Sequence, residues 1–310
     1  MLIIHIGMPK TGSSYLQSIA AKNRDELSNM GIIYPHGRND YAALAGNISS
    51  GNGDVLKILS PKKDTTNLLS NELFFLDFEK TIAHIKNAIK SGIPVRLVML
   101  TRDLLPLLCS MWQQTIKRGG LHNVDIDHYL EAHARTWLAM ILRWIHWCSA
   151  NNVPLKTLNY SKVKNELAQN FFKECVGLKN IGSLQFYDEQ PVNRSLTRSE
   201  IVLQQIANEY FGKASSAQVS DVLVNQCPTV KADIIRPSTE VALRVHDYTR
   251  PLLNRINHYL PRTQQLAFDG ENVMQLGREL SPDEPLIFSR SQLTALLSGL
   301  QKHDKSTSSQ

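Results

Sequence analysis

The segment that most constrains the fold is the N-terminus, where an apolar run passes through a glycine-bounded loop into a helical pattern. Residues 2–6 read Leu-Ile-Ile-His-Ile, which is typical of a strand buried on both faces. Gly7 and Gly12 bound the loop, and Ser14 to Asn29 shows the pattern of a helix. The first N–H groups of such a helix have no intrahelical partner, and its dipole is positive at that end. The segment therefore predicts a phosphate-binding loop.

The remaining chain alternates apolar runs with long helical patterns, which favours parallel strands joined by crossover helices. We expect an α/β fold with a central parallel sheet, flanking helices and a helical C-terminal portion. The predicted domains are an α/β core over 1–212, a helical portion over 213–300 packed on the same domain, and a flexible tail over 301–310. Further strands are predicted at 31–35, 67–70, 95–101 and 155–160, loops at 39–67, and helices at 78–91, 104–117, 127–150, 162–176, 198–211, 216–224, 239–260 and 289–300.

Composition narrows the class of protein. Apolar residues make up 42% of the 310 residues and charged residues 20%, which excludes a disordered chain. The net charge of +6 suits an anionic ligand but is too small to indicate nucleic acid. The four cysteines are widely spaced, which predicts neither a disulfide framework nor a zinc site. With no signal peptide or membrane span in the pattern, we expect a cytoplasmic protein.

The loop differs from the P-loop of kinases, which needs Gly, four residues and then Gly-Lys-Ser/Thr. Ser13 stands where that lysine would be, and Lys10 lies inside the loop instead. No strand ends in an aspartate suited to magnesium, so we expect no metal. The alternative for this segment is an ordinary glycine-containing turn with a solvated lysine.

Residues 9–14, Pro-Lys-Thr-Gly-Ser-Ser, resemble the 5′-phosphosulfate loop of the sulfotransferase family, its bacterial members in particular. These enzymes use 3′-phosphoadenosine 5′-phosphosulfate as sulfuryl donor and have a P-loop NTPase-like fold. The resemblance covers residues 1–212. It implies that Lys10 contacts the 5′-phosphate and the bridging oxygen, and that the segment Thr11, Gly12, Ser13 and Ser14 supplies backbone and hydroxyl donors.

A second motif strengthens this interpretation. The strand at 95–101 leads into Arg102, and Ser110 follows eight residues later in a predicted helix. This spacing resembles the family's 3′-phosphate motif, and an arginine fork matches phosphate geometry. The alternative for Arg102 is a surface arginine paired with Asp103. Arg194 is a further candidate for binding the donor, although Thr197 to Glu200 is itself typical of a capping box at a helix start.

Sulfuryl transfer needs a group that stabilises the leaving phosphate and a base for the acceptor's proton. Lys10 is the candidate for the first role. Glu72 is the leading candidate for the base because it follows a predicted strand, with an exposed helical glutamate as the equal alternative. His5 is the second candidate, weighed against a core histidine, and His36 is a third.

The leading hypothesis is a sulfotransferase acting on a hydroxyl or amine acceptor, with carbohydrate or glycolipid suggested by the resemblance alone. The alternatives are a small-molecule kinase with an atypical P-loop and a non-catalytic nucleotide or nucleic-acid binder. We expect no nucleic-acid partner. The C-terminal arginines are interpreted as a solvated face, with an acceptor platform for acidic glycans or a peripheral membrane contact as the alternative.

Overall fold

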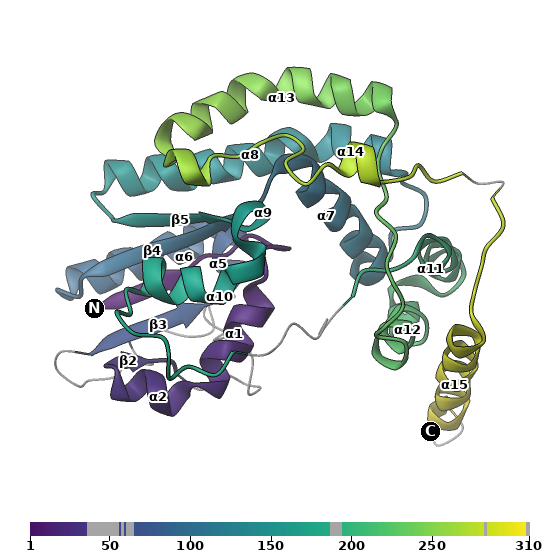
Figure 1. The fold of residues 1–310 in the computed structure, drawn as a ribbon, viewed down its shortest axis with the longest axis horizontal. Helices are drawn as coiled ribbons and strands as arrows, with labels where there is room; N and C mark the ends of the chain where they lie inside the picture. The colour runs from purple at the N-terminus through teal and green to yellow at the C-terminus, as the bar shows by residue number, and fades with distance from the viewer. Residues whose placement is uncertain (36–55, 57–58, 60–64, 187–193, 282–283, 308–310) are drawn as a thin grey trace. The chain divides into compact units, whose positions relative to one another are not determined.

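The computed structural model describes residues 1–35, 56, 59, 65–186, 194–281 and 284–307 (Figure 1). The candidate His36 lies outside these residues, as do most of the loops predicted at 39–67. The chain divides into two compact units: the first comprises Met1–Asp103, Thr136–Asp188 and Pro251–Ala267, and the second Leu104–Arg135, Glu189–Arg250 and Phe268–Gln310. The second unit therefore takes residues from both sides of the boundary predicted at 212.

Within the described residues, the first unit is built on a five-stranded sheet in which every strand is parallel, which confirms the predicted α/β class with a central parallel sheet (Figure 1). The strand order is β2-β3-β1-β4-β5. The chain runs through β3 on one side of β1 and then through β4 on the other, so the order reverses at β1. Such a reversal is where open α/β sheets place their ligands, at the carboxyl ends of the strands. The strands are β1 (Leu2–His5), β2 (Ile32–Ile33), β3 (Thr66–Ser70), β4 (Val95–Thr101) and β5 (Leu155–Asn159).

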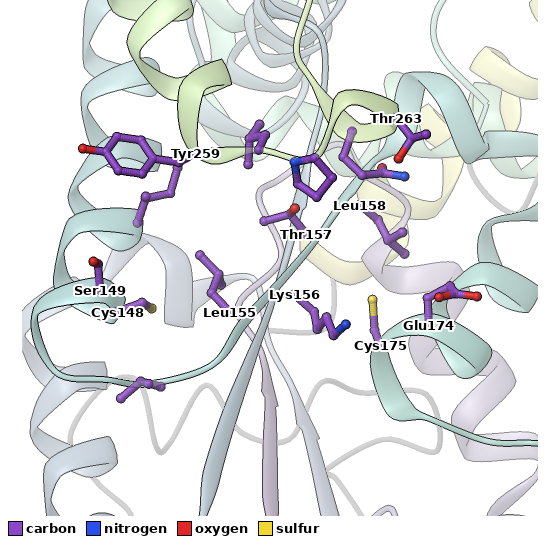
Figure 2. A pocket seen from close by; sticks show the side chains of 15 residues that line it. Cys148, Ser149, Leu155, Lys156, Thr157, Leu158, Glu174, Cys175, Tyr259 and Thr263 are labelled. Atoms are coloured by element: carbon purple, nitrogen blue, oxygen red, sulfur yellow. The ribbon is translucent and has the colours of Figure 1, made fainter.

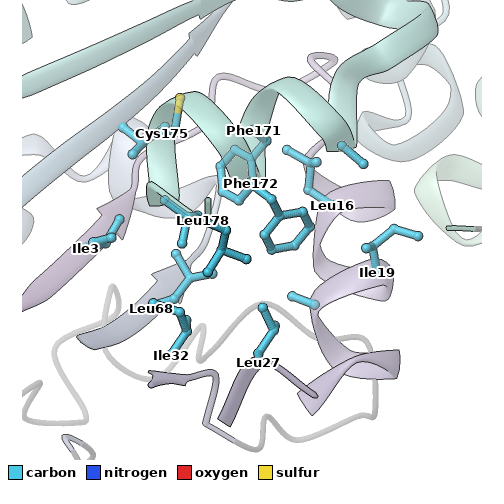
Figure 3. Packing of buried hydrophobic residues seen from close by; sticks show 14 of the residues in the cluster. Ile3, Leu16, Ile19, Leu27, Ile32, Leu68, Phe171, Phe172, Cys175 and Leu178 are labelled. Atoms are coloured by element: carbon cyan, nitrogen blue, oxygen red, sulfur yellow. The ribbon is translucent and has the colours of Figure 1, made fainter. Parts of the chain in front are cut away.

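The central strand β1 is buried on both faces, as its apolar run predicts. Ile3 joins a core cluster with Leu16 of the first helix and Phe171 (Figure 3). Ile4 points to the opposite face and is equally buried. Burying a side chain of this size stabilises the fold by roughly 1.5–3 kcal/mol. The burial of both faces therefore holds the end of β1, where the loop begins, in a fixed position.

The helices of the first unit begin and end close to the predicted positions, with two differences. The helix predicted from Ser14 to Asn29 is interrupted at Asn23, whose side chain donates to Gln185 O and accepts from Gln185 N. The helix predicted at 162–176 consists of four short pieces. The elements are α1 (Ser13–Lys22), α2 (Arg24–Asn29), α5 (Leu73–Leu76), α6 (Phe78–Lys90), α9 (Tyr160–Val163), η1 (Lys164–Glu166), α10 (Leu167–Asn170), the π-helical η2 (Phe171–Val176) and η4 (Arg262–Gln264).

The second unit is helical. Its α11 begins with the predicted capping box, in which Thr197 and Glu200 bond reciprocally. The predicted tail starts inside α15, which continues to Thr307. The elements are α7 (Leu104–Gly119), α11 (Arg198–Phe211), η3 (Gly212–Ala217), α12 (Ser220–Gln226), α14 (Val273–Leu276) and α15 (Arg290–Thr307), while α8 (Ile126–Ala150) and α13 (Thr239–Tyr259) divide between the units.

Candidate anion-binding site

The loop after β1 is anchored to the neighbouring strand. Ile6 N donates to Val98 O at 2.8 Å, and Met8 N donates to Leu100 O at 3.4 Å. The Thr11 hydroxyl then donates back to Met8 O at 2.6 Å and is fully buried. The loop therefore has a defined shape that is set mainly by main-chain atoms.

Two residues of this loop have left-handed backbone conformations, Lys10 with φ 65° and Gly12 with φ 82°. Glycine is needed at the second position for space as well, because a Cβ on Gly12 would lie 2.5 Å from a methyl carbon of Leu167. Helix α1 starts at Ser13, and its first bond runs from Leu16 N to Gly12 O at 3.1 Å. The N–H groups before Leu16 are thus not used within the helix, as anion binding requires.

A small polar network lies beneath the loop. His5 is fully buried, and its Nδ1 lies 2.7 Å from Ser70 Oγ, which also accepts a bond from Gln17 Nε2 at 3.2 Å. Burial lowers the pKa of His5 to about 3, so the imidazole is neutral. Among the described residues, His5 Nε2 and the buried Ser13 Oγ have no hydrogen-bond partner. The buried polar groups beneath the loop are therefore not fully hydrogen-bonded.

Arg102, the first residue of the second predicted motif, contacts the loop directly. Arg102 follows β4, its Nη1 donates to Lys10 O at 3.1 Å, and its guanidinium lies 5.2 Å from the ring centre of Tyr160. The carboxylate of Asp103 is used elsewhere, since it accepts from the Asn159 side chain at 2.8 Å. The structure therefore brings Arg102 and the Lys10 loop together at the carboxyl edge of the sheet.

Glu72 lies at the same edge, just after β3. The preceding Asn71 donates its N–H to His5 O at 3.2 Å, which ties this turn to the end of β1. Burial raises the pKa of the half-buried Glu72, and the nearby positive charge of Lys10 opposes that rise. The two groups are close enough to interact electrostatically, so the candidate base and the candidate cation share one region.

Arg194 is engaged in a different structure. It lies in the second unit, where its guanidinium holds the Glu200 carboxylate through two bonds of 2.7 Å. Its other bonds go to three backbone carbonyls, those of Ser195, Leu223 and Cys227. All five N–H groups of the arginine are thus used, and a role in donor binding stays a prediction that this conformation does not favour.

One predicted site residue stays untested, and three residues near the loop were not predicted. Ser110 lies on α7 in the second unit, and its predicted role stays a prediction. Ser70 and Gln17 were missed, because their contact with His5 depends on strand register, which one sequence does not reveal. Tyr160 was missed as a partner for Arg102, although an aromatic residue directly after a predicted strand was an available signal.

A separate cavity of about 530 Å³ lies along the edge strand β5 (Figure 2). None of the candidate residues lines it. Its wall includes Cys148 and Cys175, and burial raises the pKa of each thiol to about 12. Both sulfurs are therefore protonated and unsuited to nucleophilic chemistry.

Comparison of the chain with protein-family models finds no match, and comparison with curated proteins finds none either. Within the described residues, no three His, Cys, Asp or Glu side chains come together as metal ligands. The same part of the chain contains no helix with the length and apolar character of a membrane span.

Proposed function

We propose that this chain is a sulfotransferase that moves a sulfuryl group from 3′-phosphoadenosine 5′-phosphosulfate to a hydroxyl or amine acceptor, within a P-loop NTPase-like fold. The observation that carries the proposal is the hydrogen bond between Arg102 Nη1 and Lys10 O, which spans 92 residues of sequence. This bond brings Arg102, from the motif that resembles a 3′-phosphate site, beside the Lys10 loop at the carboxyl edge of the sheet. A bisphosphorylated nucleoside needs two such anion sites at one place, which a single loop does not provide.

The loop supports binding of the 5′-phosphosulfate. The N–H groups at the start of α1 that make no bond within the helix, together with the ammonium group of Lys10, supply several donors and one positive charge. Arg102 is assigned to the 3′-phosphate by the resemblance, because a guanidinium fork matches phosphate geometry and its bond to Lys10 O brings it beside the loop.

The chemistry follows from these positions. The acceptor oxygen or nitrogen forms a bond to sulfur while the bond from sulfur to the bridging phosphate oxygen breaks, and 3′,5′-adenosine bisphosphate leaves. Lys10 stabilises the negative charge that grows on the leaving oxygen. Glu72 takes the proton of the acceptor. A carboxyl whose pKa is raised by burial is a better base than an exposed glutamate, and the positive charge of Lys10 opposes that rise and so favours the ionised form.

The acceptor is proposed by resemblance to be a carbohydrate or glycolipid. The candidate base sits after β3, in a turn tied to β1, so the acceptor group would approach from the β3 side of the loop. A cytoplasmic location belongs to this proposal as well.

The test is a calorimetric titration with 3′,5′-adenosine bisphosphate, run beside ATP with and without magnesium. We expect the bisphosphate to bind without magnesium and ATP to bind much more weakly. A screen of acceptor classes with sulfur-labelled donor then reads out transfer. Magnesium-dependent binding of ATP would support the kinase alternative instead. Steeply salt-dependent binding of nucleic acid without turnover would support the binder.

A further inference from the structure

The buried polar groups beneath the loop form an ordered series. Gln17 on α1, Ser70 at the end of β3 and His5 at the end of β1 follow one another through contacts of 3.2 and 2.7 Å. All three side chains are buried, His5 completely. Polar groups in such surroundings are normally placed for a purpose, because an unsatisfied one costs roughly 1–3 kcal/mol.

The hydrogen-bond pattern of this series favours one tautomer of the histidine. Gln17 Nε2 donates to Ser70 Oγ. Ser70 Oγ lies 2.7 Å from His5 Nδ1, and the Ser70 hydroxyl proton has no other acceptor among the described residues, so we assign that proton to the bond with Nδ1. With Nδ1 as acceptor, the proton of the neutral imidazole is on Nε2. The series therefore ends in an N–H donor at the atom that has no partner among the described residues.

That donor faces Ser13. A Cβ built on Gly7 would lie 2.6 Å from His5 Nε2 and 2.5 Å from Ser13 Oγ, so both atoms border the same small space. Gly7 leaves this space open because it has no side chain. Ser13 Oγ is buried and also lacks a partner among the described residues. A shift of Ser13, the first residue of α1, would bring the two atoms into contact.

We propose that His5 is a positioning residue of the anion loop: when an oxyanion occupies the loop, His5 Nε2–H donates to Ser13 Oγ, and the Ser13 hydroxyl donates to the anion. The proposal rests on the proposed function for the identity of that anion, the 5′-phosphate. Every donor in the series then points one way, from Gln17 through Ser70, His5 and Ser13 to the ligand. Hydrogen bonds aligned in this manner polarise and strengthen one another.

This role differs from that of a base. Burial holds the imidazole neutral across the physiological range, since its pKa is about 3, and its free nitrogen faces a serine of the loop. His5 would act on the ligand only through Ser13.

Two substitutions separate the functions of the two ring nitrogens. His5→Asn places an amide near the position of Nδ1 and keeps the bond to Ser70, but nothing reaches Ser13. His5→Gln reaches the position of Nε2 and gives up the bond to Ser70. Both variants lose the packing of the imidazole against Phe171, at 5.1 Å between ring centres, so they are matched in that respect.

We expect His5→Asn to bind 3′,5′-adenosine bisphosphate about tenfold more weakly than the wild type, and His5→Gln to bind within about threefold of it. Ser13→Ala should also lose about tenfold, and His5→Asn should add nothing in that background, because both changes break one series. Melting temperatures of both His5 variants are measured alongside. A purely structural His5 would instead weaken binding equally in both variants, and that result overturns the inference.

A measurement on the unaltered protein covers the case in which the variants do not fold. Inorganic pyrophosphate is titrated into the wild-type chain labelled with ¹⁵N-histidine, and the His5 nitrogens are followed by NMR. The Nε2 resonance should move much more than Nδ1, and an unchanged Nε2 resonance under saturating pyrophosphate contradicts the inference. If pyrophosphate moves Nε2 but the bisphosphate does not bind, the proposed function fails while the role of His5 stands. If neither ligand binds, both fail.

Discussion

Two buried polar networks, one in each unit, have opposite characters. In the second unit, Arg194 and Glu200 form a bidentate pair with the guanidinium saturated by backbone carbonyls. The carboxylate also accepts from Thr197 N and from Gln292. In the first unit, His5 and Ser13 are equally buried, yet each keeps a polar atom without a partner among the described residues.

Under the proposed function, the difference separates groups that hold the fold together from groups that would serve a ligand. Burial alone would raise the pKa of Glu200, but the bonds from Arg194, Thr197 and Gln292 outweigh it and keep that pKa below its usual value. Such a network stabilises the folded state only while it is complete. The unsatisfied atoms of His5 and Ser13, next to the N-terminus of α1, instead destabilise the folded state. A bound anion that completes their hydrogen bonds would remove this destabilisation.

The largest expected effect is on stability, from Arg194→Leu. This change leaves the fully buried Glu200 carboxylate without its counter-charge, which typically costs about 3–5 kcal/mol. Chemical denaturation of the full chain measures the loss. Affinity for 3′,5′-adenosine bisphosphate should stay within about twofold under conditions where the variant is folded, because the arginine has no donor to spare for a ligand.

The matched control is Arg118→Ala, which removes an arginine–carboxylate pair with Asp221 whose arginine is about half exposed. Exposed pairs contribute about 0.2–1 kcal/mol. If Arg194→Leu instead left stability unchanged and weakened bisphosphate binding, Arg194 would be a ligand contact and the contrast between the networks would be lost.

The next effect is on rate, from Lys10→Ala. Removing a preorganised group that meets the leaving phosphate typically lowers turnover by about 10²–10³-fold, or roughly 2.7–4 kcal/mol. Steady-state assays with labelled donor measure it. The unfolding free energy should change little, because this lysine is only half-buried and, under the proposed function, serves the ligand rather than the fold.

Lys90→Ala provides the control. It makes the same change of charge at the exposed end of α6, which precedes β4 and so lies toward the opposite edge of the sheet. Its turnover should equal that of the wild type. Activity of Lys10→Ala within tenfold of the wild type would remove this lysine from the mechanism.

The strands β1 and β4 were predictable from sequence because they are nearly continuous apolar runs, and the loop was predictable because Gly7 and Gly12 mark its ends. The carboxyl-edge placement of Lys10, Arg102 and Glu72 followed from the parallel sheet alone. These features depend on local pattern and on general topology rules.

What the sequence could not provide depends on contacts distant in the chain. The break at Asn23 exists because of its bonds to Gln185, and the network of His5 depends on its register opposite Ser70. The prediction that Arg194 binds the donor stays untested, but it did not anticipate Glu200 as a bidentate partner, although the two lie only six residues apart. The capping box was visible in the sequence, but the inward direction of the arginine was not.

The smallest expected effect tests whether Glu72 belongs with the groups that serve a ligand. Glu72→Gln should lower turnover by about 10²-fold and leave bisphosphate binding unchanged, since only proton removal from the acceptor is lost. It should also raise the melting temperature at neutral pH. The pKa of Glu72 is raised by burial, so its ionised form destabilises the folded state.

The sign of this stability effect fixes its pH window. A carboxyl with a raised folded-state pKa costs stability increasingly as pH rises from its unfolded value to its folded value, and the full cost persists above that. The gain in Glu72→Gln should therefore grow as pH rises above 4.5, the ordinary pKa of glutamate, and vanish in acid. The acid limb of the wild-type turnover profile should lie above 4.5, the ordinary pKa of glutamate. A glutamine variant that keeps full turnover would show that Glu72 is merely a buried residue of the turn, and a second base would have to be sought at the same edge of the sheet.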